Sequence, residues 1–238
     1  MTNTDINTFT KIFKREISDI YTLDNEEIIE RFFNYYINLV ETNKKFNLTA
    51  ITEVEDVIKK HFADSLLPLQ AGIITPNAVC ADIGTGAGFP GLPIAMFRPD
   101  IKMDLIDSLK KRLTFLDEVT RITHTENCTT IHSRAEDHAK SGNREKYDFV
   151  FSRAVSRLAT LTELCLPLVK IGGKMVALKS KTANEEIKEA QKVIELLGGK
   201  FEQLYGTEER NLVIITKIAQ TPPIYPRKAG TPEKFPIL

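Results

Sequence analysis

Hydrophobic residues recur at three- and four-residue steps through most of the first seventy residues. This spacing gathers them on one face of a helix, and it predicts helices over 6–20 and 28–40. The second helix follows the stretch 24–27, whose asparagine and acidic residues suit an N-cap with a capping box. A third helix is predicted to begin at Thr52, and the residues before it, 44–51, interrupt the pattern and predict a loop. The chain is therefore expected to begin with a helical region.

From residue 78 the pattern changes to short hydrophobic strands that alternate with helical stretches. We predict strands at 78–84, 102–107, 128–133, 147–154, 174–179, 201–206 and 210–219. Helices are predicted near 91–97, from Ser108 as a cap to Ile122, near 158–169 and near 184–197. Strands that alternate with helices form right-handed crossover units, and this alternation predicts a parallel sheet. Too few residues separate the last two strands for a crossover helix, so these two are predicted to pair antiparallel.

The predicted fold class is α/β, with a mostly parallel seven-stranded sheet, a closing antiparallel hairpin and an N-terminal helical extension. Five parallel strands followed by such a hairpin are the layout of Rossmann-like methyltransferases. We expect a helical extension at 1–72, a Rossmann-like core at 73–220 and a proline-rich basic tail at 221–238. Five prolines in the last seventeen residues predict that the tail is extended rather than folded on its own.

The length of 238 residues suits one large domain or a domain with an appendage, and 42% hydrophobic residues are ample for a buried core. The longest hydrophobic run, 92–97, falls far short of the roughly 20 residues that span a bilayer, and the polar start lacks the core of a signal peptide. The 3 cysteines are too few and too scattered for a disulfide framework or a Cys-x-x-Cys metal site. We expect a soluble cytoplasmic protein that needs no membrane and no metal.

The charges balance, with 32 basic and 32 acidic side chains. A net charge of zero argues against a general nucleic-acid coat protein, because non-specific affinity comes mainly from Lys and Arg that neutralise phosphates. The charge is nevertheless segregated, since 168–181 holds four lysines and no acid. Such clusters are more often solvated faces than binding sites, so a local phosphate-binding patch stays an open alternative.

The segment 81–91, ADIGTGAGFPG, follows the first predicted strand. Its first three glycines are Gly84, Gly86 and Gly88. They allow a tight turn and a close approach of the backbone to a bulky cofactor. The same residues also spell the G-x-G-x-x-G of dinucleotide enzymes, so the spacing leaves NAD open. Asp82 before the first glycine, the terminal hairpin and Pro90 at the helix start favour S-adenosylmethionine, which has no pyrophosphate to cradle. A tight connection without a ligand is the third alternative.

Further candidates follow the ends of the next strands, where open α/β sheets bind ligands. Asp107 ends the second strand and is placed to accept both ribose hydroxyls of a nucleoside, although capping the next helix is an alternative role. Ala135 and Glu136 follow the third strand, where an adenine would lie against the sheet. Arg153 follows the fourth strand, and an ordinary surface ion pair is its alternative.

Together these motifs resemble, over essentially the whole chain, the bacterial small-subunit ribosomal RNA guanine-N7 methyltransferases, also known as the glucose-inhibited division protein B family. The segments that carry the resemblance are 47–49, 61–66, 82–95, 107–116, 134–136, 148–155, 210–214 and 225–237. The proline-basic tail is the most specific of them and the glycine turn the least. The resemblance implies a class I fold, S-adenosylmethionine as cofactor, one modified guanine in 16S rRNA and a cytoplasmic enzyme. The methyl-donor contacts it implies are Gly84, Phe89, Ala135, Glu136 and Arg153.

The residues after the fourth strand indicate simple positioning chemistry. Amino-group methyltransferases need an Asn/Asp-Pro-Pro-Tyr type of turn and cytosine-C5 enzymes need a cysteine nucleophile, and 151–154 holds neither. Cys80 and Cys165 lie in a predicted strand and a predicted helix, so both are expected to be buried. Guanine N7 already exposes a lone pair, so we expect in-line transfer without a general base or covalent intermediate. Ser152 and Arg153 are expected to help position the reactants.

The candidates for RNA contact are Asn47, His61, Asp64, Lys179, Arg227 and Lys228. His61 lies beside the hydrophobic face of the third helix, so a hydrogen-bonded structural histidine is as good an interpretation as a substrate contact. We expect a monomer that acts on 16S rRNA within the 30S subunit or its precursor, with ribosomal proteins helping to shape the substrate. The alternatives are a small-molecule methyltransferase, a nucleotide-sensing module and a nicotinamide dehydrogenase.

Overall fold

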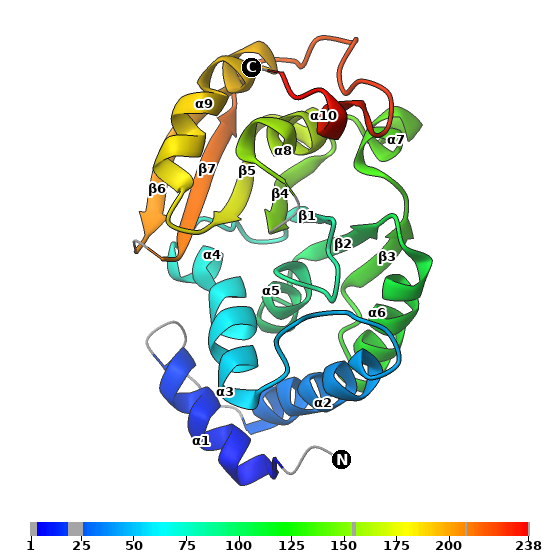
Figure 1. Ribbon diagram of the computed structural model, residues 1–238, viewed down its shortest axis with the longest axis vertical. Helices are drawn as coiled ribbons and strands as arrows, with labels where there is room; N and C mark the ends of the chain where they lie inside the picture. Colours follow the sequence, from blue (N-terminus) through cyan, green and yellow to red (C-terminus); the bar gives the residue numbers. More distant parts are fainter. Residues whose placement is uncertain (1–3, 19–25, 154–155, 208, 238) are drawn as a thin grey trace.

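The computed structural model describes residues 4–18, 26–153, 156–207 and 209–237. Within them the strands form one sheet in the order β3-β2-β1-β4-β5-β7-β6 (Figure 1). The strands are β1 Val79–Ile83, β2 Lys102–Asp107, β3 Cys128–His132, β4 Tyr147–Arg153, β5 Val169–Lys179, β6 Gly199–Gly206 and β7 Asn211–Lys217. The first five run parallel, and β7 lies antiparallel to both β5 and β6. This sheet confirms the predicted fold class, including the antiparallel hairpin of the last two strands.

The strand prediction fails most at the start of β5. The strand begins at Val169, where it pairs with Tyr147, rather than at 174. Lys170 and Gly172 between these points are exposed, and Gly172 has a φ of +84°. The pairing with β4 is irregular there, so the sequence carries no hydrophobic alternation that would mark it as a strand. The predicted last residue of the fourth strand, 154, lies outside the described residues.

Helices cover both faces of the sheet. The longer helices of the core are α5 Gly91–Phe97, α6 Lys110–Ile122, α8 Leu158–Cys165 and α9 Ala183–Leu196. The short ones are α4 Leu67–Gln70, α7 Ala135–His138 and α10 Thr231–Lys234, with single turns at 139–143 and 166–168. The prediction that Ser108 caps α6 was wrong, because the helix begins at Lys110 and Leu109 occupies the cap position without a side-chain hydrogen bond. The helix α7 was not predicted, since its four residues are too few to show a period.

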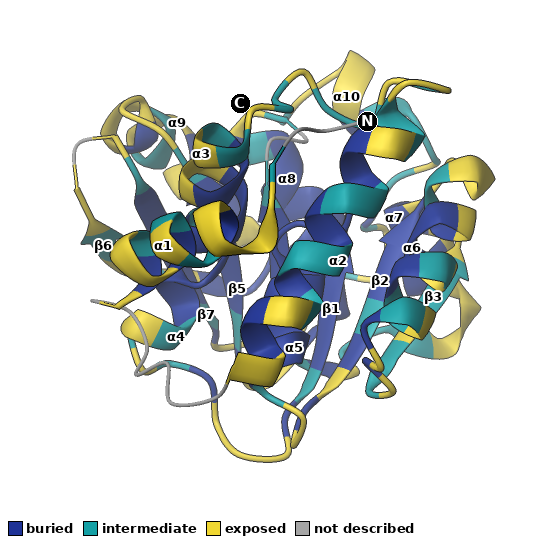
Figure 2. Ribbon diagram, turned by 90° about the horizontal axis from the view of Figure 1, so that it is seen from below, coloured by how far each residue is buried: buried dark blue, intermediate teal, exposed yellow. Residues whose placement is uncertain are grey.

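The N-terminal helices share a core with the sheet rather than standing apart. They are α1 Ile6–Ile17, α2 Glu26–Asn43 and α3 Val54–Val57, which continues as a wider π-type helix over Ile58–Ala63. Their aromatic rings pack together, with Phe32 and Phe62 at a centroid distance of 4.9 Å, and they join α5, α6 and one face of the sheet in one hydrophobic cluster. Helices α7, α8 and α9 pack on the other face in a second cluster. Figure 2 shows the resulting buried centre around the strands.

The predicted starts of these helices had mixed outcomes. Thr52 does not begin the third helix, because α3 starts at Val54 with Glu53 at the cap position and without a side-chain hydrogen bond. The proposed capping box at 24–27 and the predicted last residues of the first helix fall partly outside the described residues. The division at residue 72 stays a prediction, and the shared core shows that the N-terminal helices are packed on the sheet.

The tail runs over the core as an extended segment with the short α10 near its end. It is held by side chains of the core that bind its backbone. Arg144 Nη1 donates to the Tyr225 carbonyl at 2.6 Å, and Glu136 Oε1 accepts from Gly230 N at 2.8 Å. A proline-rich segment has few amide donors of its own, so contacts of this kind fix its path.

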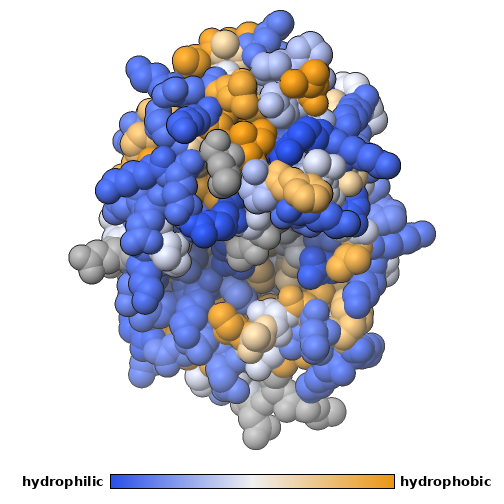
Figure 3. Space-filling view, turned by 45° about the horizontal axis from the view of Figure 1, so that its top comes forward, coloured by the Kyte–Doolittle hydropathy of each residue, from blue (hydrophilic) through white to orange (hydrophobic). Residues whose placement is uncertain are grey.

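The surface is largely hydrophilic in the view of Figure 3, with hydrophobic side chains in separate small groups. The most exposed large ones are Ile224 and Phe235 of the tail, at 72% and 69% exposure. Among the described residues, none of the helices combines the length and the hydrophobicity needed to cross a bilayer.

Candidate active site

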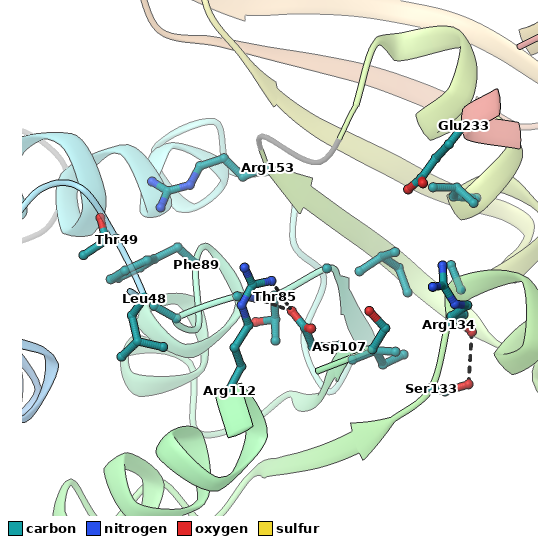
Figure 4. A pocket seen from close by; sticks show the side chains of 18 of the residues that line it. Leu48, Thr49, Thr85, Phe89, Asp107, Arg112, Ser133, Arg134, Arg153 and Glu233 are labelled. Carbon is teal, nitrogen blue, oxygen red and sulfur yellow. Dashed lines mark hydrogen bonds and ion pairs between the residues drawn. The ribbon is translucent and has the colours of Figure 1, made fainter. Parts of the chain in front are cut away.

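A cleft of about 500 Å³ opens where β1, β2, β3 and β4 end. The order of the sheet reverses between β1 and β4, and such a switch point is where open α/β sheets bind ligands. The cleft is lined by the glycine turn, by Asp107, by 133–136 and by Arg153 (Figure 4). Thr49 of the N-terminal region closes one end and Glu233 of the tail closes the other. His61 lines the cleft beside Thr49, with its Nε2 2.9 Å from Thr49 Oγ1. Its volume lies in the range of small-molecule and cofactor pockets, roughly 300–1,000 Å³.

Two glycines of the turn serve different purposes. A Cβ on Gly86 would meet only the Gly84 carbonyl, at 3.8 Å, so any side chain there would project into the cleft. A Cβ on Gly88 would lie 2.5 Å from Tyr35 Oη, so Gly88 is required for packing against α2. Both have positive φ, +60° and +101°, which favours glycine independently. Gly86 keeps space for a ligand, and Gly88 lets the N-terminal helices pack against the turn.

Asp82 lies beneath the turn and is fully buried. Its Oδ2 accepts from Thr85 Oγ1 at 2.7 Å and from Gly91 N at 2.9 Å, whereas no described residue donates a hydrogen bond to Oδ1. Burial raises the pKa of Asp82 to about 6, against the lowering effect of these two hydrogen bonds. The carboxylate thus takes the first amide of α5, which in a dinucleotide site would face the pyrophosphate. This arrangement argues against the NAD alternative.

Asp107 lines the cleft and also accepts two backbone amides. Oδ1 accepts from Leu109 N at 2.8 Å, which fixes the approach to α6, and Oδ2 accepts from Gly86 N at 3.0 Å, which fixes the turn. Arg112 Nη1 lies 3.2 Å from Oδ2 and projects into the same cleft (Figure 4). The carboxylate lines the cleft and has lone pairs left for further donors, so capping and ligand binding are compatible.

The end of the cleft that Glu233 closes is lined by Ala135 and Glu136, at the start of α7. Both are buried, and the Glu136 carboxylate is bound to the tail through Gly230 N. Glu233 of α10 faces Arg134 across this end in Figure 4. The tail therefore forms part of the wall, and no motif in the sequence predicts this.

Three side chains stack at the end of the cleft that Thr49 closes, and they are Arg153, His61 and Phe89. The guanidinium of Arg153 lies 4.9 Å from the centroid of the Phe89 ring, and the His61 ring stacks on the same ring at 4.6 Å. Arg153 also donates to the Lys60 carbonyl at 3.0 Å, and its Nη2 lies 3.2 Å from His61 Nδ1. Ser152, one residue earlier, donates to the Ile83 carbonyl at 2.8 Å and so ties β4 to β1 without lining the cleft.

His61 is held by contacts at both ring nitrogens. Nδ1 lies 3.2 Å from Arg153 Nη2, which can only donate, and 3.1 Å from the Lys60 carbonyl, which can only accept, and Nε2 lies 2.9 Å from Thr49 Oγ1. Burial, and next the charge of Arg153, lower the pKa of His61 to about 4, so the ring is neutral at pH 7. His61 is thus hydrogen-bonded and 8% exposed, as the structural interpretation requires, and it also lines the cleft.

A second cavity of about 410 Å³ adjoins the first and shares His61 and Arg153 with it. Asp64 and Lys179, both predicted to contact RNA, line this cavity. The ammonium of Lys179 is already paired, since it lies 2.8 Å from Glu186 Oε2 and 2.6 Å from the Ser156 carbonyl.

The other predicted RNA contacts lie outside both cavities. Arg227 Nη2 lies 2.7 Å from Glu163 Oε2, and its Nε contacts the same carboxylate, so this side chain anchors the tail. Asn47 and Lys228 are exposed. Leu48, Thr49, Arg112 and Glu233 line the first cavity and were not predicted. In the described ranges, no group of three or more His, Cys, Asp or Glu side chains is arranged to hold a metal.

The chain is similar to known proteins over most of its length. The profile of the family described as rRNA small subunit methyltransferase G matches residues 28–213. The protein named ribosomal RNA small subunit methyltransferase G from Desulforamulus reducens is 50% identical over 213 residues, which are 87% of this chain and 89% of that protein. The protein of the same name from Lactobacillus johnsonii is 43% identical over 236 residues, 95% of this chain and 99% of that one.

Solved structures share the fold at low sequence identity. A Corynebacterium glutamicum protein superposes with a TM-score of 0.56 at 18% identity, over 90% of this chain and 99% of its own. The ribosomal protein L11 methylase of Lactobacillus delbrueckii subsp. bulgaricus gives a TM-score of 0.52 at 12% identity, over 68% and 80% of the two chains. With the family profile covering most of its residues and relatives above 40% identity spanning nearly its whole length, the chain belongs to the rRNA small subunit methyltransferase G family.

Proposed function

We propose that this protein transfers a methyl group from S-adenosylmethionine to N7 of one guanine in 16S rRNA. Membership of a family named for small-subunit rRNA methylation supports the acceptor. The observation that carries the choice of donor is the hydrogen bond from Gly91 N to Asp82, because it uses the helix amide that a pyrophosphate would need.

The first cavity suits the proposed cofactor at each end. Asp107 is placed to accept ribose hydroxyls, and the space above Gly86 admits a ligand against the backbone of the turn. Ala135 and Glu136 would border the adenine, while Arg153 at the opposite end would pair with the methionine carboxylate. Gly84 and Phe89 complete the predicted set, and Gly88 would act indirectly by seating the turn on α2. When bound, S-adenosylmethionine supplies an electrophilic methyl group on a sulfonium.

The residues of the site would act by placing the acceptor rather than by moving a proton. Guanine N7 carries a lone pair and no hydrogen, so no general base is required. His61 is neutral at pH 7, and its ring adds no positive charge where the purine becomes positive. Ser152 holds β4 against β1 and thereby fixes the backbone that carries Arg153. Alignment of two reactants in this way accounts for rate factors of roughly 10⁵–10⁸ in favourable cases.

Covalent catalysis through a cysteine is disfavoured by burial. Cys80 and Cys165 are both 0% exposed, and burial raises the pKa of each thiol well above its usual range. Burial also raises the pKa of Cys128 to about 12. A thiolate nucleophile near the acceptor is therefore not available, which supports direct transfer to a ring nitrogen.

The remaining roles follow from the same proposal. Lys228 and Asn47 are exposed and suit contacts with RNA phosphates, whereas Lys179 and Arg227 are occupied by Glu186 and Glu163. We propose that the helical extension, core and tail work as one unit on the 30S subunit or its precursor in the cytoplasm. A net charge of zero does not favour tight binding to naked RNA, and this supports a substrate whose shape depends on ribosomal proteins.

A methyl-transfer assay tests this proposal. Subunits and protein-free rRNA from a strain lacking the gene are incubated with the protein and labelled S-adenosylmethionine. We expect label in 16S rRNA, faster on 30S subunits than on free rRNA. Binding of S-adenosylmethionine without label in any ribosomal substrate would refute the proposed acceptor.

A further inference from the structure

The second cavity is formed where β4, β5 and β7 meet the N-terminal helical region. It is lined by Leu178 and Lys179 of β5, by Asn211 of β7 and by Asp64 just after the π-type helix. The first cavity lies at the ends of β1, β2, β3 and β4, and the second lies beside β5 and β7, so the two cavities adjoin at the end of β4. Arg153 and His61 form their common wall. A molecule in the second cavity would therefore face one in the first across these two side chains.

Asp64 lines this cavity, and one of its carboxylate oxygens has no hydrogen-bond donor among the described residues. Its Oδ1 is buried and lies 3.1 Å from Arg210 Nη1, but no described residue donates to it with hydrogen-bond geometry. Burial raises the pKa of Asp64, and the charge of Arg210 opposes this effect. Oδ1 therefore has a neighbouring cation but no directed donor among the described residues, and an N–H group of a ligand would satisfy it.

The other acids of the cavity are less suited to that purpose. Glu186 accepts from Lys179, from Leu158 N at 2.7 Å and from Thr182, so its oxygens are used within the protein. Glu209 is exposed at the rim. Asp64 is the remaining described acid that lines the cavity, and it stands one helical turn from His61 in the common wall.

We propose that Asp64 recognises the Watson–Crick edge of the acceptor guanine, with its carboxylate accepting from N1–H and from the exocyclic N2–H. This inference rests on the proposed function. The N7 edge and the Watson–Crick edge of guanine adjoin at O6 and point in different directions. A guanine whose N7 faces the first cavity can therefore place N1 and N2 against the wall of the second cavity that carries Asp64. An adenine would present the N1 lone pair to the carboxylate and be repelled, so Asp64 would determine the choice of base.

Replacing the acceptor guanine by inosine isolates this contact, because inosine keeps N7 and N1–H and lacks only the 2-amino group. The substrates are 30S subunits reconstituted with 16S rRNA that carries guanosine or inosine at the mapped acceptor. We expect the wild type to lose about 10- to 100-fold in kcat/KM on inosine, as for a lost hydrogen bond to a charged group. Asp64→Asn should be slow on guanosine and discriminate between the two substrates by less than about twofold, with unchanged affinity for S-adenosylmethionine.

Matched variants control for folding and for charge. Glu55→Gln removes a carboxylate on the neighbouring α3 that pairs with Arg15 outside the cavity, and it should behave as wild type on both substrates. Asp64→Glu keeps the charge and should retain part of the discrimination. A wild type that methylates both substrates equally would overturn the role of Asp64, even if Asp64→Asn does not fold. An Asp64→Asn that retains the wild-type penalty for inosine would also overturn it. No methylation of guanosine by the wild type would instead refute the proposed function itself.

Discussion

Replacement of Asp107 by Asn separates the ligand role of this side chain from its structural one. The carboxylate accepts two backbone amides, Gly86 N at 3.0 Å and Leu109 N at 2.8 Å, and it lies 3.2 Å from Arg112. An Asn side chain has one oxygen, so it keeps one of these amides and turns an NH₂ group toward the other. We expect a loss of about 1–3 kcal/mol in the free energy of unfolding, which is typical of a buried donor left unsatisfied.

The same substitution removes an acceptor for the ribose. A hydrogen bond to a carboxylate contributes about 1.5–3 kcal/mol, so the affinity for S-adenosylmethionine should fall roughly 10- to 150-fold. Isothermal titration calorimetry measures this affinity, and urea unfolding measures the stability.

Asp100→Asn is the matched control, because Asp100 also accepts one backbone amide, Asn77 N at 3.1 Å, and pairs with an arginine, Arg98. It does not line the cleft, so it should lower stability without changing the affinity. Equal affinity of the wild type and Asp107→Asn would refute the ribose role and leave only the capping role.

Three further substitutions probe the walls of the site. Tyr35→Phe removes the hydroxyl that donates to the Ala87 carbonyl, and it should lower the free energy of unfolding by about 1–3 kcal/mol and weaken cofactor binding in calorimetry. Glu163→Gln removes the negative charge that pairs with Arg227. The amide hydrogen exchange of the tail should therefore become faster, while the exchange of α6 stays unchanged. His61→Gln tests pH dependence: the pKa of His61 is about 4 in the fold and 6.5 ordinarily, so the unfolded chain binds the extra proton. Wild-type stability should therefore be complete above pH 6.5 and fall toward pH 4, more steeply than in His61→Gln.

The parts of the fold that the sequence predicted well are those with a local cause. The strand at 102–107 was placed correctly because its hydrophobic residues are bounded by polar ones, and the helix near 91–97 because a glycine and a proline mark its start. The start of β5 was missed where exposed residues and two glycines replace the alternation. The helix cap at Ser108 was misplaced because Asp107 holds the next amide instead.

The site was predictable only where a motif marks it. The glycine turn and Asp107 lie on the ends of neighbouring strands, so their meeting follows from the alternation of strands and helices. Glu233 reaches the same cleft from the far end of the chain, and no local pattern announces it. Arg227, a candidate for RNA contact, pairs in the fold with Glu163, 64 residues away, and the sequence does not predict this pairing. Pairings of this kind depend on tertiary structure and leave no periodic signal.

Mapping the modified base in 16S rRNA shows whether this protein methylates N7 of one guanine. Ribosomal RNA is isolated from a strain lacking the gene and from the same strain complemented with the wild type or with Arg153→Gln, and it is treated with a reagent that cleaves at N7-methylguanine. We expect cleavage at one guanine that depends on the wild-type protein and is reduced with Arg153→Gln. An identical cleavage pattern with and without the gene would contradict this expectation.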